Sequence, residues 1–294
     1  MQLYSQPAPA NALKVSPKAK LNVAIFESIL DLYAFNKAHT GHHRKTDAWQ
    51  GNMSTQEAMQ CALNGRQEGL DKALRTLDGF EQFLEAPAPR SVIVSDVAGG
   101  VPNVPAYLAG HPLNMRRRQR VADALAPLTV VIDLTTTFTI KPAQIEKRGL
   151  AVFAFVRAMA AIRPVTLYVA CGLGCEGDAT SSAYYAAVPL ETAPLDLARA
   201  FFMITHVAMA RALLCPVVGE VHKNDKDGQS IGWDGSWPYR SSEQAKASMR
   251  DGFAQVFGGD VFTVAPLQST DKAIDNPEGW LKETLAMYSR ADAA

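Results

Sequence analysis

From residue 91 onward, short β-branched runs alternate with longer stretches of helical periodicity, and this alternation constrains the fold more than any other feature. Such alternation is typical of βαβ units, in which helices connect parallel strands and cover the sheet. The runs predict strands over 91–97, 129–138, 165–171, 182–190, 215–221 and 261–266, and the periodicity predicts helices over 114–126, 142–162, 195–213, 242–256 and 277–289. We therefore expect a three-layer α/β fold with a mainly parallel sheet flanked by helices.

The residues before this alternation have a different character. The first twenty are rich in Ala, Pro and Lys, which favours a flexible arm. Ser54 and Glu57 have the spacing of a capping box, and Gly65 is a natural stop, so we expect a helix between them. The expected parts are a flexible arm, a small helical extension and an α/β core domain, at residues 1–20, 21–87 and 88–294.

Composition limits the partners and the compartment. The 294 residues include 29 Lys and Arg and 29 Asp and Glu, so the net charge is zero and bulk electrostatics recruit neither nucleic acid nor an anionic membrane. The four cysteines show no paired spacing that would indicate a disulfide scaffold. No signal-like leader and no run of about 18 apolar residues is found. We expect a cytoplasmic protein with free thiols, and its neutrality favours self-association.

The run over 129–138 contains an acid followed by hydroxyls. Asp133, Thr135 and Thr137 occupy alternate positions where the strand gives way to a loop. Ligands of α/β proteins bind at the carboxyl ends of parallel strands, and hard cations prefer oxygen ligands. The spacing therefore predicts a cation site. The alternative is that Asp133 caps a turn and the threonines are ordinary strand residues.

The same three residues match, in type and spacing, the D-x-[ST]-x-[ST] motif of the von Willebrand factor type A domain, which the order of predicted elements also resembles. The resemblance implies a non-enzymatic interaction module whose Mg²⁺ or Mn²⁺ accepts an acidic residue from a protein partner. It also implies ligands from two further loops, a threonine and an aspartate: Thr192, and Asp225 or Asp227.

A second resemblance covers more of the chain. Residues 102–117, with Trp49 and Gly51 upstream and Arg148 and Gly149 downstream, are similar to a family of uncharacterised proteins encoded by tailed bacteriophages. This resemblance implies a virus-encoded protein in a bacterial host cytoplasm or a virion. It implies no activity and no catalytic residue.

Two groups of side chains are candidates for partner contact, three arginines and three aromatic residues: Arg116, Arg117 and Arg118, and Trp233, Trp237 and Tyr239. The arginines, with Arg120, open a predicted helix and could hold the phosphates of a nucleic acid, or they form a solvated face paired with acids. The aromatic residues lie in a Gly-rich loop that either anchors a partner or packs against the sheet.

The sequence leaves three functions open. The first is the metal-dependent interaction module, and the second is a phage virion or assembly component that self-associates and in which Asp133 is structural. The third is a metal-dependent hydrolase or nuclease that combines Asp133 with Asp225, Asp227 or Glu220. The chain lacks G-x-x-x-x-G-K-[ST], G-x-S-x-G and H-E-x-x-H, which disfavours most common enzyme classes.

Overall fold

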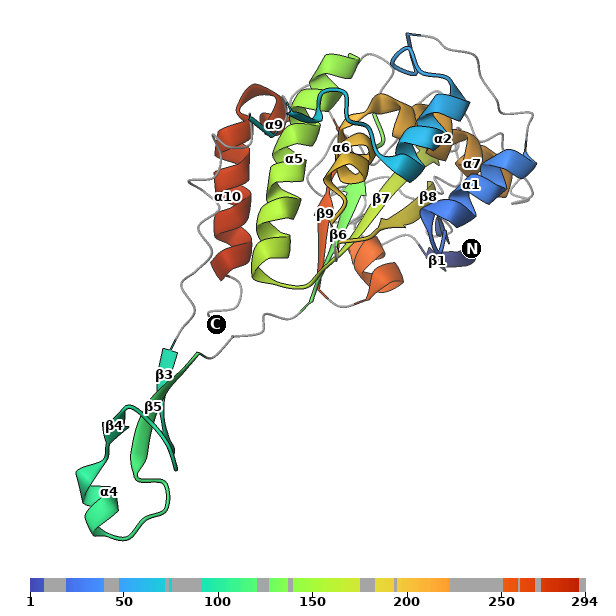
Figure 1. The fold of residues 1–294 in the computed structure, drawn as a ribbon. Helices are drawn as coiled ribbons and strands as arrows, with labels where there is room; N and C mark the ends of the chain where they lie inside the picture. Colours follow the sequence, from blue (N-terminus) through green and yellow to red (C-terminus); the bar gives the residue numbers. More distant parts are fainter. Residues whose placement is uncertain are drawn as a thin grey trace.

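The structure is a computed structural model with two sheets, a six-stranded sheet in the main body and a separate three-stranded sheet (Figure 1). It describes residues 1–7, 20–39, 48–71, 74–75, 91–120, 127–136, 140–174, 183–192, 195–222, 251–258, 260–267 and 271–290.

The main sheet is mixed, with strand order β1-β2-β8-β7-β6-β9. Its strands are β1 (Gln2–Pro7), β2 (Lys20–Ile25), β6 (Leu128–Asp133), β7 (Val165–Gly174), β8 (Ala183–Leu190) and β9 (Asp260–Val264). β6, β7 and β9 are parallel, whereas β8 is antiparallel to β7 and parallel to β2. The prediction of an α/β fold with a helix-flanked sheet is confirmed, but the sheet is partly antiparallel.

The N-terminal residues differ from the expected arm and helical extension. β1 pairs with β2 from Gln2 opposite Ile25 to Pro7 opposite Lys20, and β2 pairs with β8. Leu21 and Val23 of β2 are buried in the main sheet. The two N-terminal strands therefore belong to the same sheet as the core, because apolar side chains on β2 find their burial there and not in a separate extension.

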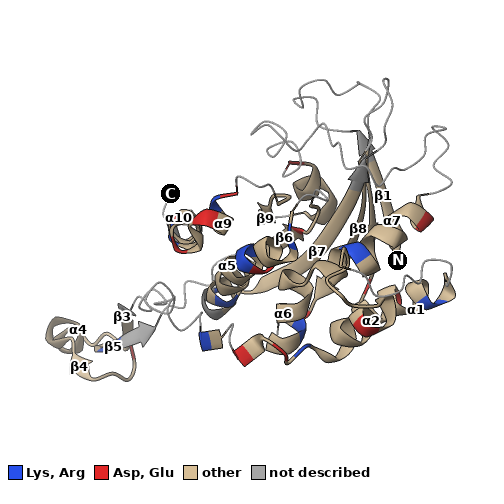
Figure 2. Cartoon of the chain, turned by 90° about the horizontal axis from the view of Figure 1, so that it is seen from above, with Lys and Arg blue, Asp and Glu red and all other residues tan. Residues whose placement is uncertain are grey.

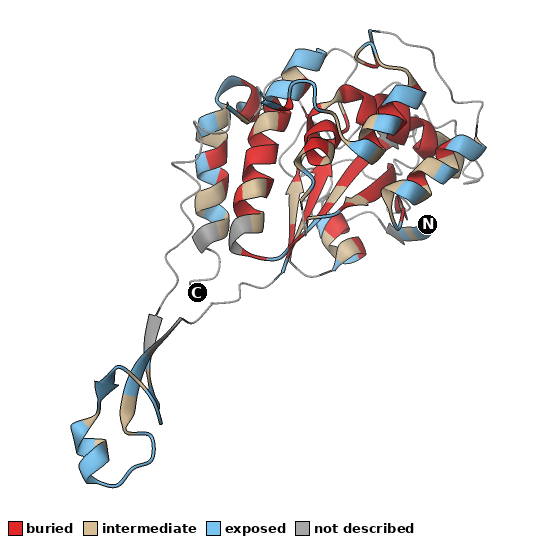
Figure 3. Ribbon diagram, in the orientation of Figure 1, coloured by how far each residue is buried: buried red, intermediate tan, exposed pale blue. Residues whose placement is uncertain are grey.

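Helices cover the two faces of this sheet unequally. The larger core lies under α1 (Ile29–Ala38), α2 (Thr55–Asn64), α5 (Pro142–Ile162), α6 (Leu197–Thr205), the π-helix η3 (Met209–Leu214), α7 (Cys215–Val221) and α10 (Pro277–Arg290). On the opposite face, Phe253 and Val256 of the helical segment 251–257 pack against Val131 and Tyr185. Figure 3 shows the buried residues concentrated in the strands and in the inner sides of the helices.

Two predicted elements have the wrong type. Residues 215–221, predicted as a strand, form helix α7, in which Val217 and Val218 are buried. Burial in the core outweighs the weak preference of valine for strands. Residues 115–120, predicted as part of a helix, form strand β5, and the predicted helix over 195–213 breaks near His206 into α6 and η3.

The separate sheet is formed by residues 91–120, which we call the lobe. It contains β3 (Ser91–Asp96), β4 (Val101–Pro102), the short helix α4 (Val104–Leu108) and β5 (Met115–Arg120), with strand order β3-β5-β4. None of its described side chains is buried. Figure 1 shows the lobe projecting away from the main body.

Within the described residues, no single helix has the length and apolarity needed to cross a membrane. α6 and the run Met209–Val221 meet that condition only together, as a pair bent by 78°.

Candidate functional site

Asp133 ends β6 at the carboxyl edge of the parallel strands and is completely buried. Its Oδ1 accepts a hydrogen bond from the backbone amide of Thr135 at 2.8 Å, and its Oδ2 accepts one from the hydroxyl of Tyr185 at 2.8 Å. Both carboxylate oxygens therefore have protein donors, one within the turn and one from the neighbouring strand β8.

Thr135 extends this network to β7. Its hydroxyl oxygen accepts a hydrogen bond from the backbone amide of Gly172 at 2.8 Å. Gly172 stands opposite Tyr185 in the β7–β8 register, and a Cβ at Gly172 would lie 2.6 Å from the Tyr185 ring. Glycine is required there because the aromatic ring that delivers the hydroxyl to Asp133 occupies the space of a side chain.

Arg148 of α5 is also buried and connects the same edge to the C-terminal elements. Its guanidinium donates to the carbonyl oxygen of Ala265, lies 3.5 Å from the carbonyl oxygen of Asp133, and pairs with Asp271 at 3.4 Å. Asp271 caps α9 (Lys272–Asp275). Arg148 therefore fixes α5, β6, the residue after β9 and α9 relative to one another.

Burial dominates the electrostatics of Asp133. Desolvation raises the pKa of this carboxyl, while the hydrogen bonds from Thr135 and Tyr185 and the charge of Arg148 lower it by smaller amounts. A carboxyl that is removed from water and hydrogen-bonded on both oxygens is suited to holding a turn.

A pair of thiols lies on the other face of the sheet. The sulfur atoms of Cys171 and Cys215 are 3.1 Å apart, and both residues are buried free cysteines. The contact with Cys215 and burial raise the pKa of the Cys171 thiol well above its usual value. Cys171 is therefore held as a neutral thiol, and not as the thiolate that nucleophilic chemistry or metal binding needs. Cys175 lies outside the described residues.

The ligand set implied by the von Willebrand resemblance does not gather around Asp133 in the described residues. The hydroxyl of Thr192 donates to the carbonyl oxygen of Val165, at the start of β7. Val165 pairs with Leu128, five residues before Asp133 on the parallel strand β6, so Thr192 lies at the opposite end of the strands. The prediction that Thr192 is a ligand beside Asp133 is therefore wrong. β8 runs antiparallel to β7, so the residues after β8 lie near the start of β7.

The other implied ligands cannot be placed. Thr137, Asp225 and Asp227 lie outside the described residues. Among the residues that are described, no group of three His, Cys, Asp or Glu side chains is arranged to hold a metal ion. Each carboxylate oxygen of Asp133 already accepts one hydrogen bond from a protein donor.

Arg211, which belongs to none of the predicted sites, organises several segments of the body. It lies in η3, is buried, and donates to the carbonyl oxygen of Trp49 at 2.9 Å and to the hydroxyl of Thr136 at 3.2 Å. Its guanidinium also stacks over the Trp49 ring, 5.0 Å from the ring centroid. A π-helical turn often marks a functional site, but here it directs an arginine that joins three segments.

The candidate partner contacts lie partly on the lobe. Arg116 and Arg117 are exposed on β5, and Arg117 pairs with Asp96 at 2.6 Å. The backbone of Arg118 continues the strand, but its side chain is outside the described set. The three aromatic residues lie wholly outside the described part of the chain: Trp233, Trp237 and Tyr239. The arginines therefore stand on a strand and not, as predicted, at the start of a helix.

The lobe also carries most of the exposed apolar side chains. Eleven large hydrophobic residues are exposed among those described, and seven of them belong to the lobe: Ile93, Val97, Val101, Val104, Tyr107, Leu108 and Leu113. The other four are scattered: Met1 and Leu3 lie at the N-terminus, Leu30 in α1 and Met287 in α10. The charges of the body are of both signs and are distributed over its helices (Figure 2).

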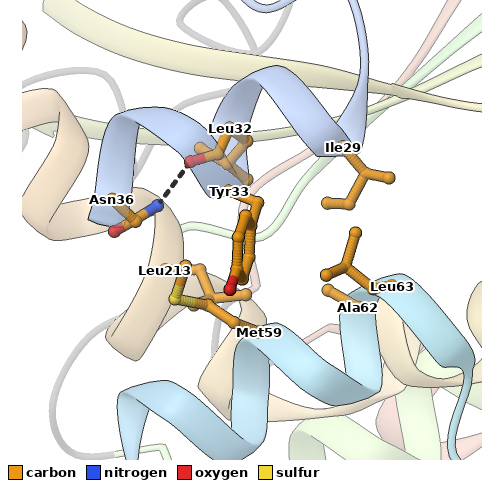
Figure 4. Close-up of a pocket in the computed structure, with 8 residues that line it drawn as sticks. All are labelled: Ile29, Leu32, Tyr33, Asn36, Met59, Ala62, Leu63 and Leu213. Atoms are coloured by element: carbon orange, nitrogen blue, oxygen red, sulfur yellow. Dashed lines mark hydrogen bonds between the residues drawn. The ribbon is translucent and has the colours of Figure 1, made fainter. Parts of the chain in front are cut away.

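A small hollow lies between α1, α2 and η3 of the body. It is lined mainly by apolar side chains, including Leu32, Met59 and Leu213, and its interior volume is about 10 Å³, about enough for one water molecule. In Figure 4 the Asn36 side chain at its margin donates to the carbonyl oxygen of Leu32 within α1. The hollow is small for a ligand site, since such sites usually enclose about 300–1,000 Å³.

Comparison with known proteins identifies a family. A family model described as a domain of unknown function, DUF7192, matches residues 12–252, which include the lobe and the Asp133 edge. No curated protein and no solved structure gives a significant match.

Proposed function

We propose that this chain, which belongs to the DUF7192 family, is a non-enzymatic assembly protein that binds a second copy of itself through the lobe. The observation that carries the proposal is the concentration of seven exposed large apolar side chains on thirty residues. Exposed apolar surface of this kind marks interaction sites when it is concentrated, whereas single exposed residues need no explanation.

The size of the lobe supports coverage by a partner. Units shorter than about 40 residues rarely bury enough apolar surface to fold alone, and they depend on disulfides, metals or association. The lobe has thirty residues, contains no cysteine, and has no buried side chain among those described. Its three-stranded sheet therefore needs apolar contacts from outside its own residues.

The partner is inferred from which surface can offer apolar contacts to the lobe. The described part of the body has only four exposed large apolar residues, and they are dispersed, so this part offers no matching surface. The lobe of a second copy offers a matching apolar surface. β3 is an edge strand whose six residues include neither Lys nor Pro, the residues that commonly guard an edge. Two β3 strands can pair antiparallel about a two-fold axis, which makes the contact the same for both copies.

The oligomeric state tests this proposal. We expect wild-type protein to form a dimer or larger oligomer by size-exclusion chromatography with light scattering, and Leu108→Asp to shift it toward the monomer. Leu108 is 79% exposed on α4, and the control Leu30→Asp changes a residue that is 64% exposed on α1 of the body. A monomeric wild type, or dissociation by both variants equally, would contradict a specific role for the lobe.

We propose the metal-dependent interaction module as a second candidate. What supports it is Asp133 at the carboxyl end of a central parallel strand that is followed by α5, with Thr135 two residues later. What weighs against it is the pair of protein donors on Asp133. Mg²⁺ or Mn²⁺ at about 100 times its dissociation constant should stabilise wild type by roughly 2.7 kcal/mol over EDTA, and should leave Asp133→Asn unchanged. Equal melting temperatures with metal and with EDTA would remove this candidate.

A further inference from the structure

Cys171 and Cys215 bring two sulfur atoms together from distant parts of the chain. The sulfur atoms lie 3.1 Å apart, although Cys215 follows Cys171 by 44 residues in the sequence. Cys171 lies in β7, and Cys215 begins α7, which packs against that strand. Neither thiol takes part in the proposed self-association or accepts a hydrogen bond for Asp133, so both are available to react with each other.

The contact is close to the geometry of a disulfide bond. Such a bond joins two sulfur atoms at about 2.05 Å, so an approach of about 1 Å would close it between Cys171 and Cys215. Both cysteines are free. A metal is a poorer fit, because zinc prefers four ligands and no third His, Cys, Asp or Glu joins the pair among the described side chains.

The two thiols differ in how an oxidant can reach them. Cys171 is 1% exposed, whereas Cys215 is 8% exposed. The contact with Cys215 and burial raise the pKa of the Cys171 thiol, so Cys171 stays protonated and is not the sulfur that attacks an oxidant. A small oxidant therefore reacts first at Cys215, and Cys171 is already in contact with the product.

We propose that Cys171 and Cys215 form a reversible disulfide when the protein meets a hydroperoxide. In the first step the Cys215 sulfur attacks the peroxide, the O–O bond breaks, and the leaving oxygen takes the Cys215 proton. Cys215 becomes a sulfenic acid, and the peroxide is reduced to an alcohol, or to water if it is hydrogen peroxide. In the second step the Cys171 sulfur bonds to the Cys215 sulfur, and the hydroxyl leaves as water with the Cys171 proton. The thiols lose two electrons and the peroxide gains two.

The bond fastens α7 to the sheet beside the hydrogen bonds of Asp133. Gly172 follows Cys171 directly and stands opposite Tyr185, whose hydroxyl donates to Asp133. At the other end of α7, the Nε2 of His222 lies 3.3 Å from the carbonyl oxygen of Tyr185. The bond also closes a loop that contains β8, α6 and η3, which restricts the unfolded chain. Oxidation is therefore expected to stabilise the body and to hold α7 in place.

The test is peptide mapping of the full-length protein, without reduction, after treatment with hydrogen peroxide at neutral pH. Trypsin cleaves after Lys and Arg except before Pro. Cys171 and Cys175 therefore fall in one peptide, residues 158–199, and Cys215 falls in another, residues 212–223. The mass of a linked pair is about 2 Da below the sum of the two peptides, because two hydrogens are lost.

Four variants assign the link to its cysteines. Cys171→Ala and Cys215→Ala each remove one member of the pair, so either one tests the proposal if the other does not fold. The matched controls are Cys61→Ala and Cys175→Ala, which remove a cysteine outside the pair. Circular dichroism verifies that each variant is folded.

We expect wild type and both controls to give the linked peptides and to lose them on addition of dithiothreitol, whereas Cys171→Ala and Cys215→Ala should give none. The oxidised wild type should melt about 5 °C above the reduced protein, and hydrogen exchange of the α7 amides should slow. Thiols of Cys171 and Cys215 that both remain free in peroxide-treated wild type would overturn the proposal. A link that persists in Cys171→Ala would also overturn it, because it would assign the bond to Cys175.

This proposal does not rest on self-association through the lobe, because both cysteines belong to the body. Light scattering of the same samples reports the oligomeric state whether or not the disulfide forms. Failure of one proposal is therefore distinguishable from failure of the other.

Discussion

The carboxylate of Asp133 accepts two hydrogen bonds inside the protein, and this state decides how its substitutions should behave. Asp133→Ala removes both acceptors and leaves the Thr135 amide and the Tyr185 hydroxyl buried without them, at a cost of about 2–5 kcal/mol. Asp133→Asn keeps an acceptor for Thr135 and lets the Tyr185 hydroxyl accept from the new amide. We expect the free energy of unfolding of the Asn variant, measured in urea at pH 7, to be less than about 1 kcal/mol below that of wild type.

The contribution of Asp133 to folding stability should change with pH in one direction. Because burial raises the pKa of Asp133, the folded protein holds this proton more tightly than the unfolded chain does. The stability that this group contributes is therefore greatest below its unfolded pKa of about 3.9 and declines as the pH rises toward the raised value. The stability of Asp133→Asn relative to wild type should therefore increase as the pH rises above about 4. A loss by the Asn variant as large as that of Ala at pH 7 would contradict a turn-holding role.

His206 should control stability in acid. Burial lowers its pKa to about 4, and its Nδ1 accepts a hydrogen bond from the amide of Ala208 at 3.2 Å. The contribution of neutral His206 is complete above its unfolded pKa of about 6.5 and is lost as the pH falls, because only the unfolded chain takes up the proton. We expect a loss of about 3 kcal/mol between pH 7 and 4, measured by urea unfolding. His206→Asn should flatten this dependence, and an unchanged slope would assign the acid sensitivity to other groups.

Two helical glycines should respond in opposite directions to substitution by alanine. A Cβ at Gly149 of α5 would lie 2.7 Å from the Cα of Thr205 in α6, whereas no atom lies within 4 Å of a Cβ at Gly219 of α7. Gly149→Ala should separate α5 from α6 and cost about 1–3 kcal/mol. Gly219→Ala meets no obstacle and should add up to about 1 kcal/mol of helix propensity. Thermal unfolding measures both, and a stabilised Gly149→Ala would show that α5 and α6 are not in close contact.

Elements with strong local signals were predictable from sequence, and those decided by distant contacts were not. The Ser54–Glu57 capping box forms as expected, because it depends on residues three positions apart. Residues 115–120 were predicted as part of a helix, and only pairing with β3 and β4 makes them strand β5. α7 was predicted as a strand from its valines, although burial decides its form.

The same distinction applies to the candidate site. The position of Asp133 at the end of a strand could be predicted from the β-branched run before it. Its partner Tyr185 could not, because it is 52 residues away and is brought there by the antiparallel β7–β8 register. The reversal of β8 also carries Thr192 away from Asp133, which the assumption of a mainly parallel sheet did not anticipate.

At the scale of the whole molecule, the body and the lobe differ in how they are stabilised. The body buries most of its apolar side chains under helices on both faces of the six-stranded sheet, whereas the lobe exposes its own. Under the proposed function, the hydrogen bonds between β3 and β5 depend on coverage by another chain. Hydrogen exchange measures the stability of such hydrogen bonds for each segment of the chain.

The most direct test is hydrogen exchange, followed by mass spectrometry, at a series of protein concentrations. We predict that the amides of residues 91–120 are protected at high concentration and lose protection on dilution, while peptides from β6, β7 and α5 keep theirs throughout. Leu108→Asp should show the diluted pattern at every concentration, and Leu30→Asp should follow wild type. Protection of the lobe that does not change with concentration would contradict its stabilisation by a second copy.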